Sequence, residues 1–400
     1  MPHPLCRPHL KRLKFVGACV AWCSISVLQG PAFAASIVIG PERQPATFVE
    51  ALERAKDGDE IIVLPGTYKG VTAVITHKRL TIRGQGQRPV FVYDGKLAEG
   101  RALFVVKGGE VRLENLEFRG ARATDGDAAG VRFETGRLEV VRCAFFDNEH
   151  GLVTANARDA ELTILESEFA RAPKVVGGLN HLLHVGTIAN FTLTGSRLYG
   201  GFEGHLVKSR ARENHLIYNM IRDGSEGEAS YEVDLPNGGR ATLIGNVISQ
   251  SPRSQNPVLI SYGAEGKVWE ENTLVLSHNT LISEGWRPAW FLRVHRDRLP
   301  GMGEVLALNN LIVGGGIFEL GAIGVNGRFA GNRPATLGML ADVVTGAFEL
   351  PPDSIWRGQV PDPRKHFGRD LAPQAEFEWP AGVRAIPPDR VRWAPGAYQR

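Results

Sequence analysis

VRLENLEF, residues 111–118, returns as LEVVRCAF at 138–145 and as LTILESEF at 162–169. Each copy alternates apolar with polar residues and ends on phenylalanine, which is typical of a short strand with one buried face. Similar segments follow around Leu193, Leu216, Asn246, Asn279 and Asn310. Such a repeat predicts a solenoid, in which each coil buries its apolar face against its neighbours. We therefore expect an all-β protein folded as a right-handed parallel β-helix.

The spacing of the repeat gives the length of each coil. One position per copy serves as a register mark, and successive marks are 22 to 33 residues apart: Asn115, Arg142, Glu166, Gly195, Asn219, Asn246, Asn279, Asn310 and Asn332. We expect the recurring asparagines to stack and to satisfy backbone groups of the turns. Insertions in a solenoid fall in loops, so the longest coils, between Asn246 and Asn310, predict the wall of a groove.

The two ends of the repeat differ from its middle. Residues 47–55 have a capping threonine, Glu50 three positions later and apolar residues on one stripe, which predicts a short amphipathic helix that caps the first coil. Residues 333–400 lose the repeat and are rich in proline. We expect a β-helix over residues 35–332 and an irregular C-terminal segment over 333–400 that packs on it.

The N-terminus has the layout of a cleaved secretory signal. Four basic residues precede an apolar run over 15–28, and the small-residue motif Ala32-Phe33-Ala34 follows. We therefore expect residues 1–34 to be a signal peptide, the mature protein to be periplasmic or extracellular, and no membrane span to remain after cleavage. Without these residues the formal charge changes from +3 to about −1, which gives no support for nucleic-acid binding. Cys143 is then the single cysteine, so no internal disulfide is expected.

Two segments resemble known proteins. DGDEIIVLPGTY, residues 57–68, resembles the opening coil of parallel β-helix proteins of the pectate-lyase-like superfamily. Lys208-Ser209, followed by Asn214 and Asn219, resembles the core motif of the alginate lyases and chondroitinase B. The resemblance implies a polysaccharide lyase in which Lys208 is the base and calcium is bound with the help of Glu203. In that family an arginine on the next coil serves as the general acid. At the matching position this chain has Tyr231 or Asp234.

The chemistry of a lyase can be placed on the same segment. β-Elimination beside a uronate needs a base, a cation that stabilises the enolate-like intermediate, and a proton donor for the leaving oxygen. Lys208 could be the base in its neutral form, which positive charges on Arg210, Arg212 and His205 would favour. Tyr231 could donate the proton.

Strand alternation predicts which side chains face solvent. If Val233 points inward, Glu232 and Asp234 share the outer face, about 7 Å apart, which suits a metal or a hydrolase pair, and Tyr231 then turns inward. The same coil position continues into residues that would complete a polar groove for an anionic glycan: Tyr262, Glu265, Arg293 and His295. By the same alternation His181 and His184 point to opposite faces and do not share a metal.

Three functions remain open from the sequence. The first is a lyase on a uronate-containing polysaccharide, with Lys208, Tyr231 and Asp234 as catalytic residues. The second is a glycoside hydrolase that uses paired carboxylates among Glu232, Asp234 and Glu265. The third is a β-helix that binds glycan or serves in envelope assembly without catalysis. The unsaturated product of elimination absorbs ultraviolet light, which distinguishes the first function from the other two.

Overall fold

The computed structural model describes residues 34–40, 48–175, 178–254, 256–321, 327–341, 343, 346 and 348–400. The chain divides into two units, Met1–Ala34 and Ala35–Arg400, and the second contains the strands and helices described. The expected signal peptide and Thr47, the expected capping residue, lie outside the described residues. No helix among the described residues is long and apolar enough to cross a membrane.

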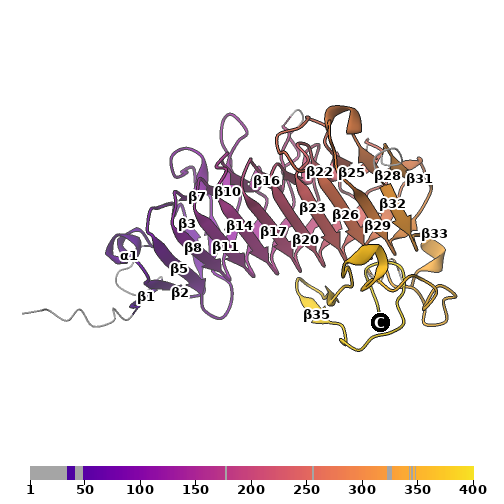
Figure 1. Ribbon diagram of the computed structural model, residues 1–400. Coiled ribbons are helices and arrows are strands. Elements are labelled where there is room, and N and C mark those ends of the chain that lie inside the picture. The colour runs from indigo at the N-terminus through magenta and orange to yellow at the C-terminus, as the bar shows by residue number, and fades with distance from the viewer. Residues whose placement is uncertain are drawn as a thin grey trace, which may run out of the picture. The chain divides into compact units, whose positions relative to one another are not determined.

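Within the described residues, nearly all strands belong to three long parallel sheets of 12, 11 and 10 strands, which we name A, B and C. Each coil contributes one strand to each sheet, and the strand pairs with its counterpart in the next coil (Figure 1). This is the parallel β-helix that the repeat predicts. Sheet A contains β1 (Ser36–Ile39), β2 (Glu60–Val63), β5 (Arg79–Gly84), β8 (Glu110–Glu114), β11 (Arg137–Val141), β14 (Glu161–Leu165), β17 (Asn190–Thr194), β20 (Glu213–Ile217), β23 (Arg240–Ile244), β26 (Thr273–Ser277), β29 (Val305–Leu308) and β32 (Gly327–Ala330).

Sheets B and C complete the coils. Sheet B contains β3 (Thr67–Lys69), β6 (Val90–Val92), β9 (Glu117–Arg119), β12 (Ala144–Phe146), β15 (Glu168–Ala170), β18 (Arg197–Tyr199), β21 (Met220–Arg222), β24 (Val247–Gln250), β27 (Thr280–Ser283), β30 (Leu311–Val313) and β33 (Arg333–Ala335). Sheet C contains β4 (Ala73–Ile75), β7 (Ala102–Val106), β10 (Ala129–Phe133), β13 (His150–Thr154), β16 (Leu183–Val185), β19 (His205–Ser209), β22 (Tyr231–Leu235), β25 (Val258–Tyr262), β28 (Ala289–Val294) and β31 (Gly316–Leu320).

The phenylalanine that closes each early repeat forms the centre of the core. Phe91, Phe118, Phe145 and Phe169 are fully or almost fully buried and stack in series, with successive ring centroids 5.7, 5.2 and 4.5 Å apart. Stacked rings one coil apart bury a large apolar area without leaving voids between coils. The sequence motif therefore encodes this row of rings directly.

A second row inside the solenoid is polar. In each coil a side chain accepts a hydrogen bond from the backbone N–H of the equivalent residue one coil earlier, at 2.9 to 3.4 Å. This ladder confirms the structural role expected for the asparagines. Its accepting side chains are Cys143, Ser167, Ser196, Asn219, Asn246, Asn279, Asn310 and Asn332.

The ladder also corrects the register. Asn115, Arg142, Glu166 and Gly195 have positive φ and directly precede the ladder position, whereas the later marks from Asn219 onward lie on the ladder itself. The equivalent positive-φ residue of the fifth coil is Tyr218. The first four register marks therefore lie one residue before the ladder position, and the later marks lie on it. The coil length between Gly195 and Asn219 changes by one residue as a result.

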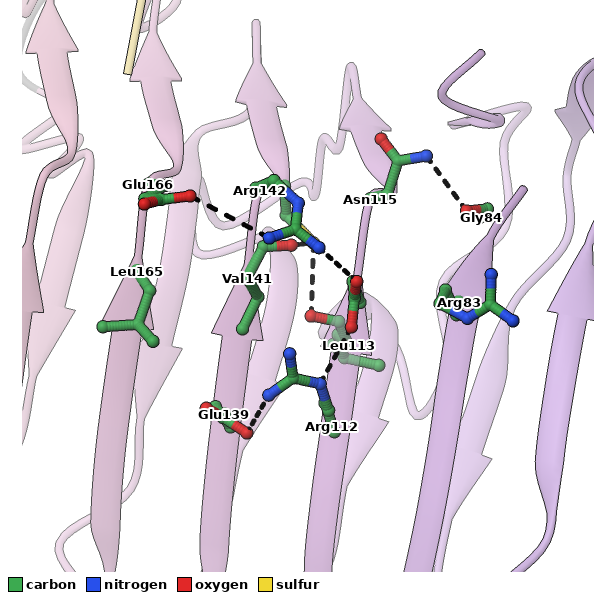
Figure 2. A network of polar contacts seen from close by, with 12 residues as sticks. Arg83, Gly84, Arg112, Leu113, Asn115, Glu139, Val141, Arg142, Leu165 and Glu166 are labelled. Carbon is green, nitrogen blue, oxygen red and sulfur yellow. Dashed lines mark hydrogen bonds and ion pairs between the residues drawn. The ribbon is translucent and has the colours of Figure 1, made fainter. Parts of the chain in front are cut away.

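The outer face of sheet A carries ion pairs between neighbouring coils. Arg112 pairs with Glu139 and Arg142 with Glu166, as Figure 2 shows. Both arginines also pair with Glu114. These side chains lie at the solvent surface, where ion pairs contribute little to stability. We interpret this face as a solvated structural surface.

Both ends of the solenoid are covered as expected, with different bounds. Helix α1 (Phe48–Arg54) places Phe48 against Phe91 and Phe104, so it caps the first coils. At the other end β33 pairs with β30, which extends the β-helix to Ala335 rather than residue 332. The remaining C-terminal residues contain three-residue 3-10 helices at Leu337–Met339 and His366–Gly368 and a small antiparallel pair, β34 (Ala375–Phe377) and β35 (Val383–Ala385). This segment packs on sheets A and B.

Candidate active site

The strands of sheet C do not alternate simply between inside and outside. In β19, Leu206 and Val207 are both fully buried, and His205 and Lys208 on either side of them point away from the core. The backbone pairing between coils skips the residue at the second position, so each strand bends there. The pattern in β19 is therefore out, in, in, out, in, and the same skipped pairing recurs in β13, β22, β25 and β28.

This bend overturns three expectations that assumed regular alternation. Glu232 is fully buried in the core rather than exposed, and Tyr231 points outward beside Asp234. Tyr262 is also fully buried, and its hydroxyl donates to the carbonyl oxygen of Gly239 at 2.5 Å. The prediction that Glu232 and Tyr262 line a substrate groove is therefore wrong.

The bend places two parallel rows of side chains on the outer face of sheet C. The first row consists mainly of rings, and its members in chain order are His150, His181, His205, Tyr231, Val258 and Trp290. The second row is mostly polar, and its members are Val153, His184, Lys208, Asp234, Ser261 and Arg293. Under the regular alternation expected from the sequence, residues three apart such as Trp290 and Arg293 would lie on opposite faces; instead they lie on the same face, and the guanidinium is 5.1 Å from the Trp290 ring.

The histidines of the first row form a stacked column. The backbone N–H of His181 donates to Nδ1 of His150 at 3.1 Å, and that of His205 donates to Nδ1 of His181 at 2.9 Å. The second bond requires Nδ1 of His181 to accept, so the proton of the neutral His181 ring is on Nε2, whereas Nδ1 of His150 also lies 3.2 Å from the carbonyl oxygen of His181. The His181 and His184 rings are 4.9 Å apart, which corrects the expectation that they point to opposite faces.

Burial favours the uncharged form of His150, His181 and His184. Desolvation lowers the pKa of His150, and desolvation together with neighbouring histidines and Lys208 lowers the pKa of His181 well below its usual value. Desolvation, followed by electrostatic interaction with His150, Arg210 and Lys208, lowers the pKa of His184 to about 3. Nε2 of His184 accepts a hydrogen bond from Arg210 at 2.9 Å, which also requires a neutral ring.

The burial of His184 predicts acid sensitivity that a single variant can reveal. As pH falls below 6.5, the unfolded chain protonates His184 whereas the folded chain resists until about pH 3, so stability is lost in this window. Asp223, whose pKa burial raises to about 6, acts in the opposite direction. Between pH 6.5 and 5 the unfolding free energy should therefore fall by about 2 kcal/mol more in the wild type than in His184→Gln. Urea unfolding at each pH measures this difference in unfolding free energy, and His215→Gln on sheet A is the control. Parallel pH profiles for the wild type and His184→Gln would contradict the prediction.

The second row carries the charges at the centre of the site. Nζ of Lys208 lies 3.0 Å from Oε1 of Glu265 and 3.9 Å from Oδ2 of Asp234. Arg210 also binds Glu265, through Nε at 3.1 Å and through Nη2 at 2.8 and 2.9 Å. Glu265 lies in the loop after β25, within the long coils where a groove wall was predicted. The structure thus brings Lys208, Arg210, Asp234 and Glu265 together as the sequence suggested.

His205 and Tyr231 adjoin this charged group. Nδ1 of His205 is 3.4 Å from Oδ2 of Asp234, and the His205 and Tyr231 rings meet edge to face at 4.8 Å. Nδ1 of His205 and Oδ1 of Asp234 are both buried and have no hydrogen-bond partner among the described residues. Four predicted site residues, His205, Lys208, Tyr231 and Asp234, therefore converge on one face.

Other motif residues serve the backbone. Ser209 is fully buried, its hydroxyl donates to Oδ1 of Asn214 at 2.6 Å, and Nδ2 of Asn214 donates to the carbonyl oxygen of Ala211 at 2.9 Å. These bonds hold the turn that follows Lys208. Arg293 lies two strands beyond Asp234 in the second row, about 10 Å away at the usual strand spacing. His295 follows β28, and burial together with the charges of Arg293 and Arg298 lowers its pKa.

The expected calcium ligand lies elsewhere. Glu203 and Glu228 line a hollow of about 330 Å³ together with Ala229, Ser230 and Asn256. Glu228 is paired with Lys174 at 2.8 Å, and the described residues contain no group of three or more acidic, histidine or cysteine side chains arranged for a metal. Calcium binding with the help of Glu203 therefore stays a prediction, and no proposed step uses a metal.

The sheets and the two rows define the protein as a parallel β-helix with a polar, ring-bearing face. Among solved structures, the chain is similar to the crystal structure of pectate lyase Pel9A, with a TM-score of 0.58 and 14% sequence identity over 92% of this chain and 96% of that chain. No protein-family model and no curated protein matches the sequence. The similarity establishes the fold, and it does not confirm the likeness of the Lys208-Ser209 segment to alginate lyases and chondroitinase B.

Proposed function

We propose that the protein is a lyase that cleaves a uronate-containing polysaccharide by β-elimination on the outer face of sheet C. The observation that carries the proposal is that Lys208 and Arg210 together bind a carboxylate, that of Glu265, at a partly exposed position. Neutralising the uronate carboxylate is the first requirement of β-elimination, because it stabilises the negative charge that develops when the C5 proton leaves. The similarity to pectate lyase Pel9A in fold agrees with this proposal.

The neighbouring rings supply the proton transfers. His205 accepts the C5 proton, Tyr231 gives its hydroxyl proton to the leaving glycosidic oxygen, and the C4–O bond breaks as the C4–C5 double bond forms. Asp234 acts as a positioning residue, since its carboxylate adjoins Nδ1 of His205. His205 and Tyr231 are in edge-to-face contact, so both protons are handled within one small region.

This assignment gives Lys208 a different role from the one that the family resemblance implies. Nζ of Lys208 makes ion pairs with two carboxylates, at 3.0 Å from Glu265 and 3.9 Å from Asp234, so the contacts of Lys208 are those of a carboxylate-binding cation. The guanidinium of Arg210, which was expected to act on Lys208, forms an ion pair with Glu265. We therefore propose that Lys208 acts as a cation toward the uronate carboxylate and that His205 is the base.

The structure gives less support to a hydrolase. Glu232 lies in the core, where burial raises its pKa well above the usual value, so it cannot pair with Asp234 at the surface. Burial alone would raise the pKa of Glu265, but the hydrogen bonds from Lys208 and Arg210 outweigh it, and the net shift is downward. A hydrolase needs one carboxyl group that keeps its proton, and Glu265 has the opposite tendency.

Trp290 and Arg293 extend the face beyond the reacting centre. A tryptophan ring with an arginine beside it can stack on a sugar and pair with its carboxylate. We propose that they bind a second uronate residue of the polymer and that Arg293 and His295 line the far end of the same groove.

We also propose that the mature protein acts outside the cytoplasm after its N-terminal signal is removed.

Incubation of the purified protein with polygalacturonate, alginate and chondroitin tests the proposal. A lyase increases the ultraviolet absorbance as unsaturated ends form. Release of reducing ends without that absorbance would favour a hydrolase, and binding without either product would favour a non-catalytic β-helix.

A further inference from the structure

The loop that carries Glu265 lies across the proposed carboxylate site. It begins after β25 and has glycines with positive φ on both sides of Glu265: Gly263 (φ 87°) and Gly266 (φ 95°). The amide of Glu265 donates to the carbonyl oxygen of Pro236 at 2.8 Å, and Nε1 of Trp269, further along the loop, donates to the carbonyl oxygen of Arg210 at 3.0 Å. The loop is therefore anchored on both sides of the site while its glycines permit local rotation.

The exposure of the three charged side chains shows which of them covers the others. The side chain of Glu265 is 42% exposed, whereas those of Arg210 and Lys208 are 22% and 13% exposed. The carboxylate thus lies toward solvent and the cations lie beneath it. Removal of the carboxylate would leave two partly buried cations side by side, an arrangement that strongly favours another anion.

The contacts of Glu265 match those that a uronate carboxylate would make. Arg210 binds it through two nitrogens, which is the geometry that guanidinium groups use for carboxylates in general, and Lys208 adds a further charge. Each oxygen of Glu265 has at least one cationic donor. A carboxylate on a sugar has the same two oxygens and the same charge, so it competes for the same donors.

We propose that Glu265 occupies the carboxylate subsite of the free protein and that an acidic sugar binds by displacing it. This inference rests on the proposed function, since it names the occupant of that same site. It gives Glu265 a role in setting affinity and selectivity for acidic sugars rather than a role in the chemical step. The Glu265 carboxylate on this long coil thereby neutralises Lys208 and Arg210 until the substrate binds.

Calorimetric titration with trigalacturonate, trimannuronate and the methyl ester of trigalacturonate tests the proposal. Glu265→Ala should bind an acidic trisaccharide at least about threefold more tightly than the wild type, because the competing ion pair is absent, and should bind the methyl ester no more tightly. Glu265→Gln, which keeps the shape and removes the charge, should change affinity in the same direction. Glu270→Ala is the matched control, because Glu270 is 92% exposed and pairs with Lys267 in the same loop.

The outcomes separate this inference from the proposed function. Unchanged or weaker binding of acidic trisaccharides by both Glu265 variants would overturn it even if the wild type is a lyase, provided that thermal melting shows both variants folded. A fall in kcat at unchanged KM would also overturn it, because Glu265 would then act in the chemical step. Tighter binding by both variants together with no turnover of any polymer would support the subsite and contradict the lyase.

Discussion

Replacing His205 with alanine should lower kcat on the cleaved polysaccharide by about 100- to 10,000-fold, the usual contribution of a general base. The variant should keep its affinity for the polymer, because Lys208 lies in the neighbouring row, Arg210 follows β19, and both retain their contacts with Glu265. The rate of formation of the unsaturated product at saturating substrate measures the effect. His215→Ala, which removes a half-buried histidine on the outer face of sheet A, is the matched control and should leave kcat unchanged.

Variants at two neighbouring residues complete the test. Lys208→Ala should raise KM as well as lower kcat, because the cation contacts the carboxylate both in the bound substrate and in the charged intermediate. Asp234→Asn should lower kcat with little effect on KM, since Asp234 acts through His205. If His205→Ala retained turnover and Lys208→Ala abolished it at unchanged KM, Lys208 would be the base, as the family resemblance implies.

The fold could be predicted from the sequence because each copy of the repeat contains the residues that pack against the neighbouring coils. The phenylalanine that ends each early copy is the stacked ring of the core, and the asparagines of the later copies are members of the hydrogen-bonded ladder. Both rows depend on contacts between equivalent positions of adjacent coils, and a period in the sequence expresses this relation directly.

The site was predictable only in part, because the direction of each side chain depends on a bend within the strands. Lys208, Tyr231 and Asp234 converge as the sequence suggested, yet regular alternation placed Glu232 outside and Tyr231 inside. A signal for the bend does exist. Aligning YEVDL of β22 with HLVKS of β19, VLISY of β25 and WFLRV in β28 shows apolar residues at the second and third positions of three of the four strands.

That alignment also explains the two residues whose roles were misjudged. Trp290 occupies the same first position as His205 and Tyr231, so it belongs to the ring row. Glu232 occupies a second position, which is apolar in the neighbouring strands, and its Oε1 has no partner among the described residues. A carboxyl group in such a position keeps its proton, and no local sequence pattern indicates this.

The second large effect is expected for Asn246 in the middle of the ladder. Its Oδ1 accepts from the backbone N–H and from Nδ2 of Asn219, both at 3.0 Å, and its Nδ2 donates to the carbonyl oxygen of Leu216 at 2.8 Å. Asn246→Ala removes these partners inside the core and leaves at least two buried backbone groups without the bonds they make now. Each unsatisfied buried group costs about 1 to 3 kcal/mol, so the variant should lose about 2 to 6 kcal/mol of unfolding free energy. Urea unfolding measures the loss, with Asn190→Ala on the outer face of sheet A as control.

The position of Asn246 makes this loss relevant to the site. The ladder changes from Cys143, Ser167 and Ser196 in the earlier coils to asparagine from Asn219 onward, and the asparagines also bond to one another. Ser167→Ala leaves one buried backbone N–H, that of Cys143, without its acceptor, while the carbonyl oxygen of Leu165 still accepts from Arg142, so it should cost about 1 to 3 kcal/mol. The asparagine part of the ladder begins in the coil of β19 and continues through the coils of β22, β25 and β28, which carry Lys208, Asp234, the Glu265 loop and Arg293. Equal losses for Asn246→Ala and Ser167→Ala would contradict the view that these coils are held more firmly than the earlier ones.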